Sequence, residues 1–232
     1  MRLISVGQAC EVAFEIRMHT PKVDADYFDW LITPFDGLIQ ALNSGFTNQL
    51  QAEDLYLQDD KNFVVNRRTG IKFGHVFKRD SAGDIITDFE TDLDRVTSIF
   101  EHLSAKFEIN ARSGAPLGFV RRDLTPDQAL IFTETISALY PELEYKIIAV
   151  NEVDMECRKL DAERFIDLVV PPSGHDGLGL AEAWAAEMLA TGLTAETFVK
   201  TKDDVFNRLM VHQLGDVHTL VQETHPQGIT AH

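Results

Sequence analysis

Residues 3–18 read LISVGQACEVAFEIRM, and this stretch decides the fold class of the chain. Leu3–Val6 predicts a short buried strand that ends at Gly7. Ala9–Met18 then predicts a helix, because its apolar side chains recur at helical spacing. A strand, a glycine, a tight turn and a helix form the opening of many α/β folds.

A second unit of this kind lies further along the chain. Gly118–Val120 predicts a strand, and Thr125 and Pro126 begin a helix as its N-cap and first helical residue. Tyr145–Val150 (YKIIAV) and Phe165–Val170 (FIDLVV) predict two more buried strands. Strand–helix–strand at this spacing implies a parallel crossover.

The remaining elements complete the predicted architecture. Periodicity and turn residues predict helices over 35–44, 88–107, 177–189 and 195–213, and a hairpin with strands 63–65 and 71–73. We therefore expect an α/β fold: a central, mostly parallel sheet flanked by helices, with a small hairpin insertion and a helical C-terminal extension. We expect one domain over residues 1–224, followed by a flexible tail over 225–232.

Charge and composition exclude two classes of partner. The 232 residues carry a formal net charge of −16 and a pI near 4.8, whereas nucleic acids and anionic membranes attract clustered Lys and Arg. No apolar run reaches the ~18 residues of a membrane helix, and the apolar start is too short for a signal peptide. We therefore expect a cytoplasmic protein that binds no nucleic acid and no membrane, with Cys10 and Cys157 reduced.

Cys10 is the first candidate for a reactive side chain. It lies between the first strand and the first helix, close to helix N–H groups that have no intrahelical partner. That environment favours a thiolate, so we expect a lowered cysteine pKa, and the same N–H groups could hold an oxyanion. The alternative is that Cys10 packs as a small buried apolar residue.

Three further side chains are candidates for assisting a nucleophile. His75 follows the second hairpin strand and could accept the thiol proton, the alternative being an exposed or core histidine. Asp29 lies between two aromatic residues, which predicts a buried functional carboxylate; it could orient His75 or cap the helix over 35–44. Asp36 is expected to cap the helix over 35–44.

Four short motifs then invite comparison with a known family. They are residues 4–13 (ISVGQACEVA), 28–30 (FDW) followed by Gly37-Leu38, 72–77 (KFGHVF) and 118–121 (GFVR). In this order they resemble segments of a bacterial family, DUF1796, described as papain-like cysteine peptidases. The resemblance covers roughly residues 3–150.

The resemblance implies a thiol protease or related hydrolase. It implies that Cys10 is the nucleophile and His75 the base, acting on a peptide or another acyl-containing substrate. Val76 stands where the family has an acidic residue after the histidine, so Asp29 is the group expected to orient His75. Papain-like enzymes combine a helical half with an antiparallel barrel half, whereas the crossover over 118–150 favours a parallel sheet.

Two other interpretations stay open. Residues 172–181 (PSGHDGLGLA) resemble the end of an SGNH-type esterase, in which Cys10 would pair with His175 and Asp167 would be the nearest preceding acid. Alternatively, the protein is a non-catalytic α/β binding module in which Cys10 only packs. No cofactor or metal is expected, because the chain has no GxGxxG, P-loop or CxxC motif and no metal-binding histidine spacing.

Overall fold

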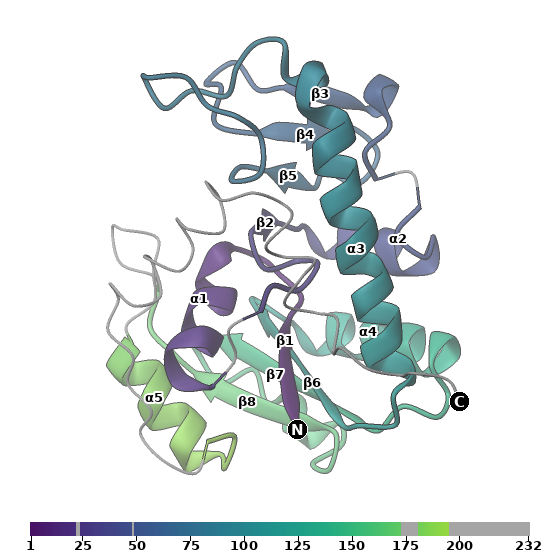
Figure 1. Ribbon diagram of the computed structural model, residues 1–232. Helices are drawn as coiled ribbons and strands as arrows, with labels where there is room; N and C mark the ends of the chain where they lie inside the picture. The colour runs from purple at the N-terminus through teal and green to yellow at the C-terminus, as the bar shows by residue number, and fades with distance from the viewer. Residues whose placement is uncertain (22–23, 48, 173–180, 195–232) are drawn as a thin grey trace, which may run out of the picture.

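The central sheet of the molecule is parallel, with its strands in the order β1-β6-β7-β8 (Figure 1). The computed structural model describes residues 1–21, 24–47, 49–172 and 181–194. The strands of this sheet are β1 (Arg2–Ser5), β6 (Leu117–Arg122), β7 (Tyr145–Asn151) and β8 (Phe165–Val169). Each coincides with a predicted strand. The α/β fold with a mostly parallel sheet is therefore confirmed.

Helices connect and flank these strands, much as periodicity predicts. The α-helices of the described residues are α1 (Cys10–His19), α2 (Phe35–Asn43), α3 (Leu93–Arg112), α4 (Pro126–Leu139) and α5 (Ala181–Ala190). Short 3-10 turns occur at η1 (Ala52–Asp54), η2 (Phe89–Asp92) and η3 (Cys157–Lys159). The predicted helix over 88–107 thus begins as a 3-10 turn and extends further, to Arg112. No helix in the described part of the chain is long and apolar enough to span a bilayer.

Two local sequence features fix the start of α4, the helix that connects the parallel strands β6 and β7. The Thr125 hydroxyl accepts a hydrogen bond from the Gln128 amide at 3.3 Å, and the Gln128 side chain accepts one from the Thr125 amide at 3.2 Å. This capping box satisfies two N–H groups that the helix itself leaves unpaired. Together with Pro126 in the first turn, it fixes where α4 begins after β6.

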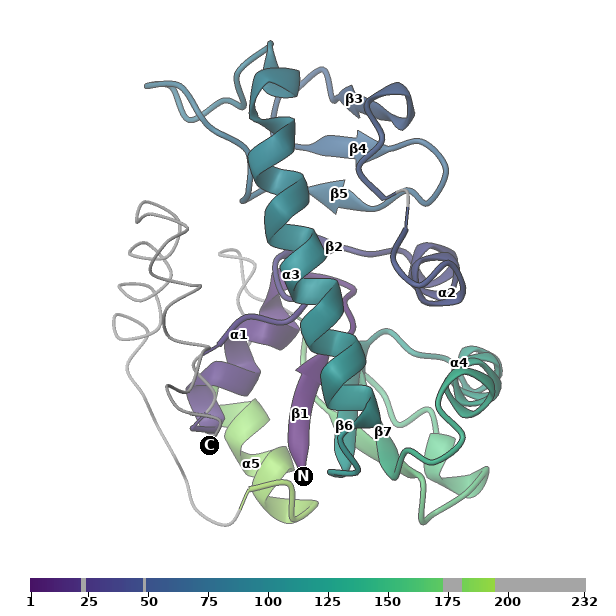
Figure 2. The same cartoon turned by 45° about the vertical axis from the view of Figure 1, so that its right-hand side comes forward.

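Helices cover both faces of the parallel sheet. On β7, Ile147 packs in the cluster that includes residues of α3 and α4, whereas Ile148 packs with residues of α1 and α5. Figures 1 and 2 show α1 and α5 together on one side of the sheet, and α3 and α4 on the other. The helices that follow the neighbouring strands β1 and β6 therefore lie on opposite faces. Such a topological switch point is where open α/β sheets bind ligands.

A second, antiparallel sheet lies beyond the parallel one (Figure 1). Its order is β2-β5-β4-β3, with β2 at Leu31–Ile32, β5 at Lys72–Phe73, β4 at Val64–Asn66 and β3 at Leu55–Leu57. The predicted hairpin is the β4–β5 pair. In its turn the Asn66 side chain accepts hydrogen bonds from the amides of Arg68 and Thr69, at 2.8 and 2.9 Å.

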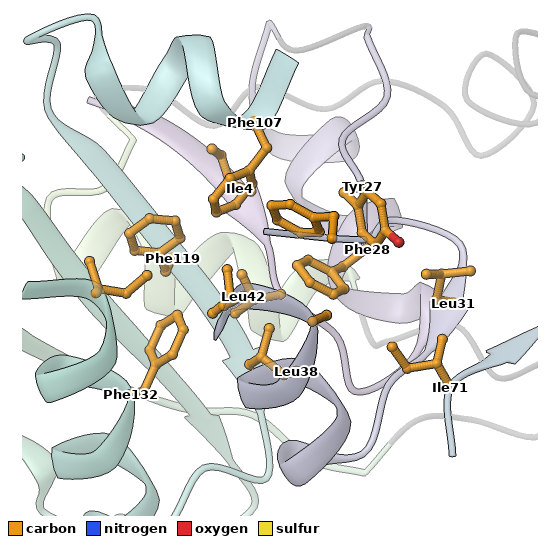
Figure 3. Close-up of a cluster of buried hydrophobic side chains, with 14 of the residues drawn as sticks. Ile4, Tyr27, Phe28, Leu31, Leu38, Leu42, Ile71, Phe107, Phe119 and Phe132 are labelled. Atoms are coloured by element: carbon orange, nitrogen blue, oxygen red, sulfur yellow. The ribbon is translucent and has the colours of Figure 1, made fainter. Parts of the chain in front are cut away.

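The long helix α3 joins the two sheets through one aromatic core. Its Phe100 contacts Phe73 of β5, with ring centroids 5.3 Å apart, and its Phe107 contacts Phe119 of β6 at 6.1 Å. Figure 3 shows Leu38 of α2 pointing into the same cluster. Both sheets are thus anchored to one helix, which fixes the loops that lie between them.

The start of α2 differs from the sequence prediction. Asp36 is exposed within the first turn of α2 and does not cap it, because the helix begins two residues earlier than a cap at Asp36 requires, with Pro34 at the N-cap position. The predicted helix over 177–189 corresponds to α5. The predicted helix over 195–213 and the tail over 225–232 lie outside the described residues.

Candidate functional site

Cys10 is the first residue of α1, at the carboxyl end of β1. Its side chain is partly buried, and it is a free thiol. The N-cap residue, Ala9, has extended backbone angles and no side chain that could bond the first N–H groups of the helix. The first amides of α1 therefore lie at the switch point between β1 and β6, beside a partly exposed thiol.

The environment of Cys10 raises its pKa, contrary to the sequence prediction. Partial burial of the thiol is the main cause, its own backbone amide offsets part of the effect, and the negative charge of Asp29 adds to the rise. Burial and a nearby carboxylate both disfavour a thiolate, and here they outweigh the helix terminus. At neutral pH the resting thiol is therefore protonated.

Asp29 is fully buried, as its aromatic neighbours predict. Its Oδ2 atom accepts hydrogen bonds from Nη2 of Arg17 at 2.5 Å and from the amide of Asp26 at 2.7 Å. Arg17 also donates to the carbonyl of Ala13 at 3.0 Å. Asp29 is thus tied to the helix that begins with Cys10. Sequence reasoning missed Arg17, because a cation in the last turn of a helix that also carries Glu11, Glu15 and His19 gives no distinctive signal.

His75 directly follows β5 and Gly74, and its side chain is exposed at the surface. Its ring meets Trp30 edge-to-face, with centroids 6.4 Å apart, and the Arg17 guanidinium lies 4.8 Å from the centroid of the same indole. Among the described residues, no hydrogen bond joins the His75 ring to Cys10 or Asp29. Trp30 therefore separates the imidazole from the Arg17–Asp29 pair.

The pKa of His75 is lowered. The surrounding protein disfavours the charged ring, and the positive charge of Arg79 acts in the same direction. An ordinary histidine has a pKa of about 6.5, so His75 is neutral at pH 7 and able to accept a proton.

Buried polar side chains hold the first turn of α1 against the parallel sheet and against α5. The Glu11 carboxylate accepts hydrogen bonds from Arg122 at 3.0 Å and from the indole N–H of Trp184 at 3.2 Å. Arg122 also donates to the carbonyl of Pro171 at 2.7 Å. The residue next to Cys10 is therefore fixed from β6, from the end of β8 and from α5. Nothing local in the sequence points to this contact, which joins residues 173 positions apart.

The strand-to-helix turn before Cys10 requires glycine. Gly7 has φ +89°, a conformation that L residues rarely adopt. A Cβ atom there would lie 2.9 Å from Cβ of Thr33 and 3.0 Å from Nη1 of Arg121. The chain that leads to the thiol is thus packed directly against two other segments.

We expect Gly7→Ala to lower the free energy of unfolding by about 2–4 kcal/mol, because it adds both backbone strain and overpacking. Gly83→Ala is the matched control, since Gly83 has the same φ of +89° but open space around a Cβ atom. Urea unfolding of both variants measures the difference. Equal losses in the two would show that the contacts with Thr33 and Arg121 do not matter.

The residues of the esterase-like alternative are placed differently. Asp167 accepts hydrogen bonds from the amides of Cys157 and Arg158, at 3.1 and 2.8 Å, so it caps η3. His175 lies outside the described residues. The second cysteine, Cys157, is fully buried, and burial together with Asp167 raises its pKa to about 12. Within the described residues no cluster of three or more His, Cys, Asp or Glu could hold a metal ion.

Fold and site together define an α/β protein with a partly exposed cysteine at a helix N-terminus, on the carboxyl edge of a parallel sheet. The chain belongs to the DUF1796 family, whose description is "putative papain-like cysteine peptidase"; the family model matches residues 1–158. Neither the curated proteins nor the solved structures gave a match to the chain. The family match ends in η3, so β8 and α5 lie beyond it.

Proposed function

We propose that the protein is a cysteine-dependent hydrolase that acts on a peptide or another acyl-containing substrate. The observation that supports this most directly is the position of Cys10, a partly exposed thiol at a helix N-terminus whose N-cap residue, Ala9, makes no side-chain hydrogen bond. A carbonyl placed above the sulfur would direct its oxygen toward the first amides of α1. Family membership points to the same chemistry.

In the proposed reaction, the sulfur of Cys10 attacks the carbonyl carbon while the neutral His75 ring accepts the thiol proton. The tetrahedral oxyanion is held by the first amides of α1. His75 then gives the proton to the leaving group as the carbon–leaving-group bond breaks, and a thioester forms on Cys10. Water, deprotonated by His75, hydrolyses this thioester and restores the thiol.

This reaction requires His75 to approach Cys10 when substrate binds. The ring is exposed and is held by the edge-to-face contact with Trp30, so a rotation of its side chain breaks no hydrogen bond within the described residues. The negative charge of Asp29, which already acts on Cys10, would favour the imidazolium that forms there. We therefore assign Asp29 a supporting electrostatic role in the proposal.

The pH dependence of acyl transfer tests the role of His75. We expect kcat/KM for p-nitrophenyl acetate to rise with pH through a pKa below about 6.5 and then to stay level through neutral pH, because deprotonation of His75 creates the base. Alkylation by iodoacetamide reports the thiolate instead, so its rate at Cys10 should rise only above the range of an ordinary cysteine.

His75→Ala should remove the rise of kcat/KM with pH and reduce kcat/KM at neutral pH by about a hundredfold. His102→Ala is the matched control, because His102 is an exposed histidine on α3 that makes no part of the site. A profile that is the same in wild type and His75→Ala would rule out His75 as the base.

A non-catalytic binding module is the second candidate. It is favoured by the raised pKa of Cys10 and by the lack of a hydrogen bond to His75 in the described residues. In that case p-nitrophenyl acetate would acylate Cys10 no faster than an unactivated thiol, and Cys10→Ser would leave the binding activity intact.

A further inference from the structure

Arg121 is a buried cation near the carboxyl end of β6. Its guanidinium donates from Nη1 to the carbonyl of Val6 at 2.7 Å and from Nη2 to the carbonyl of Thr33 at 3.0 Å. It also lies 5.5 Å from the centroid of the Phe35 ring. The residue is 2% exposed, and burial lowers its pKa to about 10. Within the described residues it makes no ion pair, whereas its neighbour Arg122 is paired with Glu11.

The two carbonyls bound by Arg121 belong to the two segments that carry the candidate site. Val6 leads through the Gly7 turn to Cys10. Thr33 directly follows β2, the strand after Asp29 and Trp30, and β2 pairs with β5, which leads to His75. Arg121 therefore joins the thiol segment to the imidazole segment.

A buried guanidinium that makes no ion pair within the described residues is costly compared with an apolar side chain of the same volume. Taking a guanidinium out of water is costly, and the two neutral carbonyls together with the negative charge of Asp123 offset only part of that cost. An apolar side chain would fill the same volume without this penalty. The planar guanidinium, however, holds two acceptors at a fixed separation, which neither an apolar residue nor a single ammonium group can do. Arginine therefore supplies a fixed separation between the Val6 and Thr33 carbonyls, and we call this connection the joint.

We propose that Arg121 is a positioning residue that fixes Cys10 relative to the segment carrying Trp30 and His75. The consequence for the reaction rests on the proposed function, but the positional role does not. One direct hydrogen bond, from the Thr33 amide to the Gln8 carbonyl at 3.0 Å, supports the same joint. Among the described residues, Arg121 contacts neither the Cys10 thiol nor the His75 imidazole.

Fluorine NMR tests the positional role without any assay of activity. The chain has two tryptophans, so 5-fluorotryptophan labelling gives one probe beside His75, at Trp30, and one beside Glu11, at Trp184. Arg121→Lys keeps the charge but cannot span both carbonyls, so the Trp30 resonance should shift while Trp184 stays in place. Arg122→Lys, on the opposite face of the same strand, should shift Trp184 and leave Trp30 unchanged. An unmoved Trp30 in Arg121→Lys, or equal shifts of both resonances, would overturn the proposal.

A double-mutant cycle tests the catalytic consequence. If Arg121 sets the spacing, the loss caused by His75→Ala should fall from about a hundredfold in wild type to about tenfold or less in Arg121→Lys. An unchanged factor would overturn this part. If His75→Ala has no effect in wild type, the proposed function fails, and the fluorine spectra still decide the positional role.

A second variant keeps both tests decisive if Arg121→Lys does not fold. Phe35→Leu removes the ring beside the guanidinium and leaves both carbonyl acceptors in place. Without the ring the plane of the guanidinium is less restricted, so its two hydrogen bonds should hold Val6 and Thr33 less firmly. The variant should therefore shift the Trp30 resonance alone and weaken the His75 effect in the same direction. Failure to do either would count against Arg121 as the joint.

Discussion

Replacing Cys10 with alanine is expected to reduce the hydrolysis of an acyl substrate by at least about a thousandfold, because the variant has no nucleophile and keeps only the oxyanion site. In wild type, intact-protein mass spectrometry after a brief reaction with p-nitrophenyl acetate should show one added acetyl group, on Cys10. The Cys10→Ala protein should show none.

Cys157→Ala is the control for this experiment. Cys157 is fully buried and its raised pKa keeps it a neutral thiol, so we expect neither its acetylation nor a loss of activity on its removal. Full hydrolysis by Cys10→Ala would place the nucleophile elsewhere and end the proposed mechanism.

Replacing Asp29 with alanine is expected to have the largest effect on stability. The variant removes the buried carboxylate that lies 2.5 Å from Nη2 of Arg17, a side chain that is itself only 7% exposed. Breaking a buried ion pair by removing one partner costs about 3–5 kcal/mol, because the remaining charge stays desolvated. For a chain of this length, the corresponding fall in Tm is roughly 10 °C.

Asp154→Ala is the matched control for the Asp29 variant. Asp154 forms an ion pair with Arg158 at the surface, also at 2.5 Å, with both side chains substantially exposed. An exposed pair of this kind contributes little to stability, because water screens both charges. Urea unfolding of both variants compares the two environments at the same separation. A loss in Asp29→Ala as small as that in Asp154→Ala would mean that the Arg17 pair does not stabilise α1.

A second variant, Asp29→Asn, separates the electrostatic role of Asp29 in the reaction from its role in holding Arg17. Asp29→Asn keeps the volume and one hydrogen-bond acceptor for the Asp26 amide but removes the charge. A folded Asp29→Asn protein that loses acyl transfer would support the electrostatic role proposed for Asp29. A folded variant with full activity would restrict Asp29 to holding Arg17.

Sequence alone determined the parts of this protein that depend on neighbouring residues. Periodicity located the parallel strands and the helices, Thr125 and Pro126 marked the start of α4, and the glycine after β1 placed Cys10 at a helix N-terminus. Two aromatic neighbours were enough to predict that Asp29 is buried. These features are encoded locally, because hydrogen bonding and side-chain period within a strand, a turn or a helix act over a few residues.

Tertiary structure alone decided which charges meet. Asp29 pairs with Arg17 rather than with His75, and the adjacent Arg121 and Arg122 project to opposite faces of the sheet, toward Thr33 and toward Glu11. The direction of the Cys10 pKa also follows from packing, since burial and Asp29 outweigh the helix terminus. These contacts depend on how elements far apart in the chain pack together, and no local pattern specifies that packing.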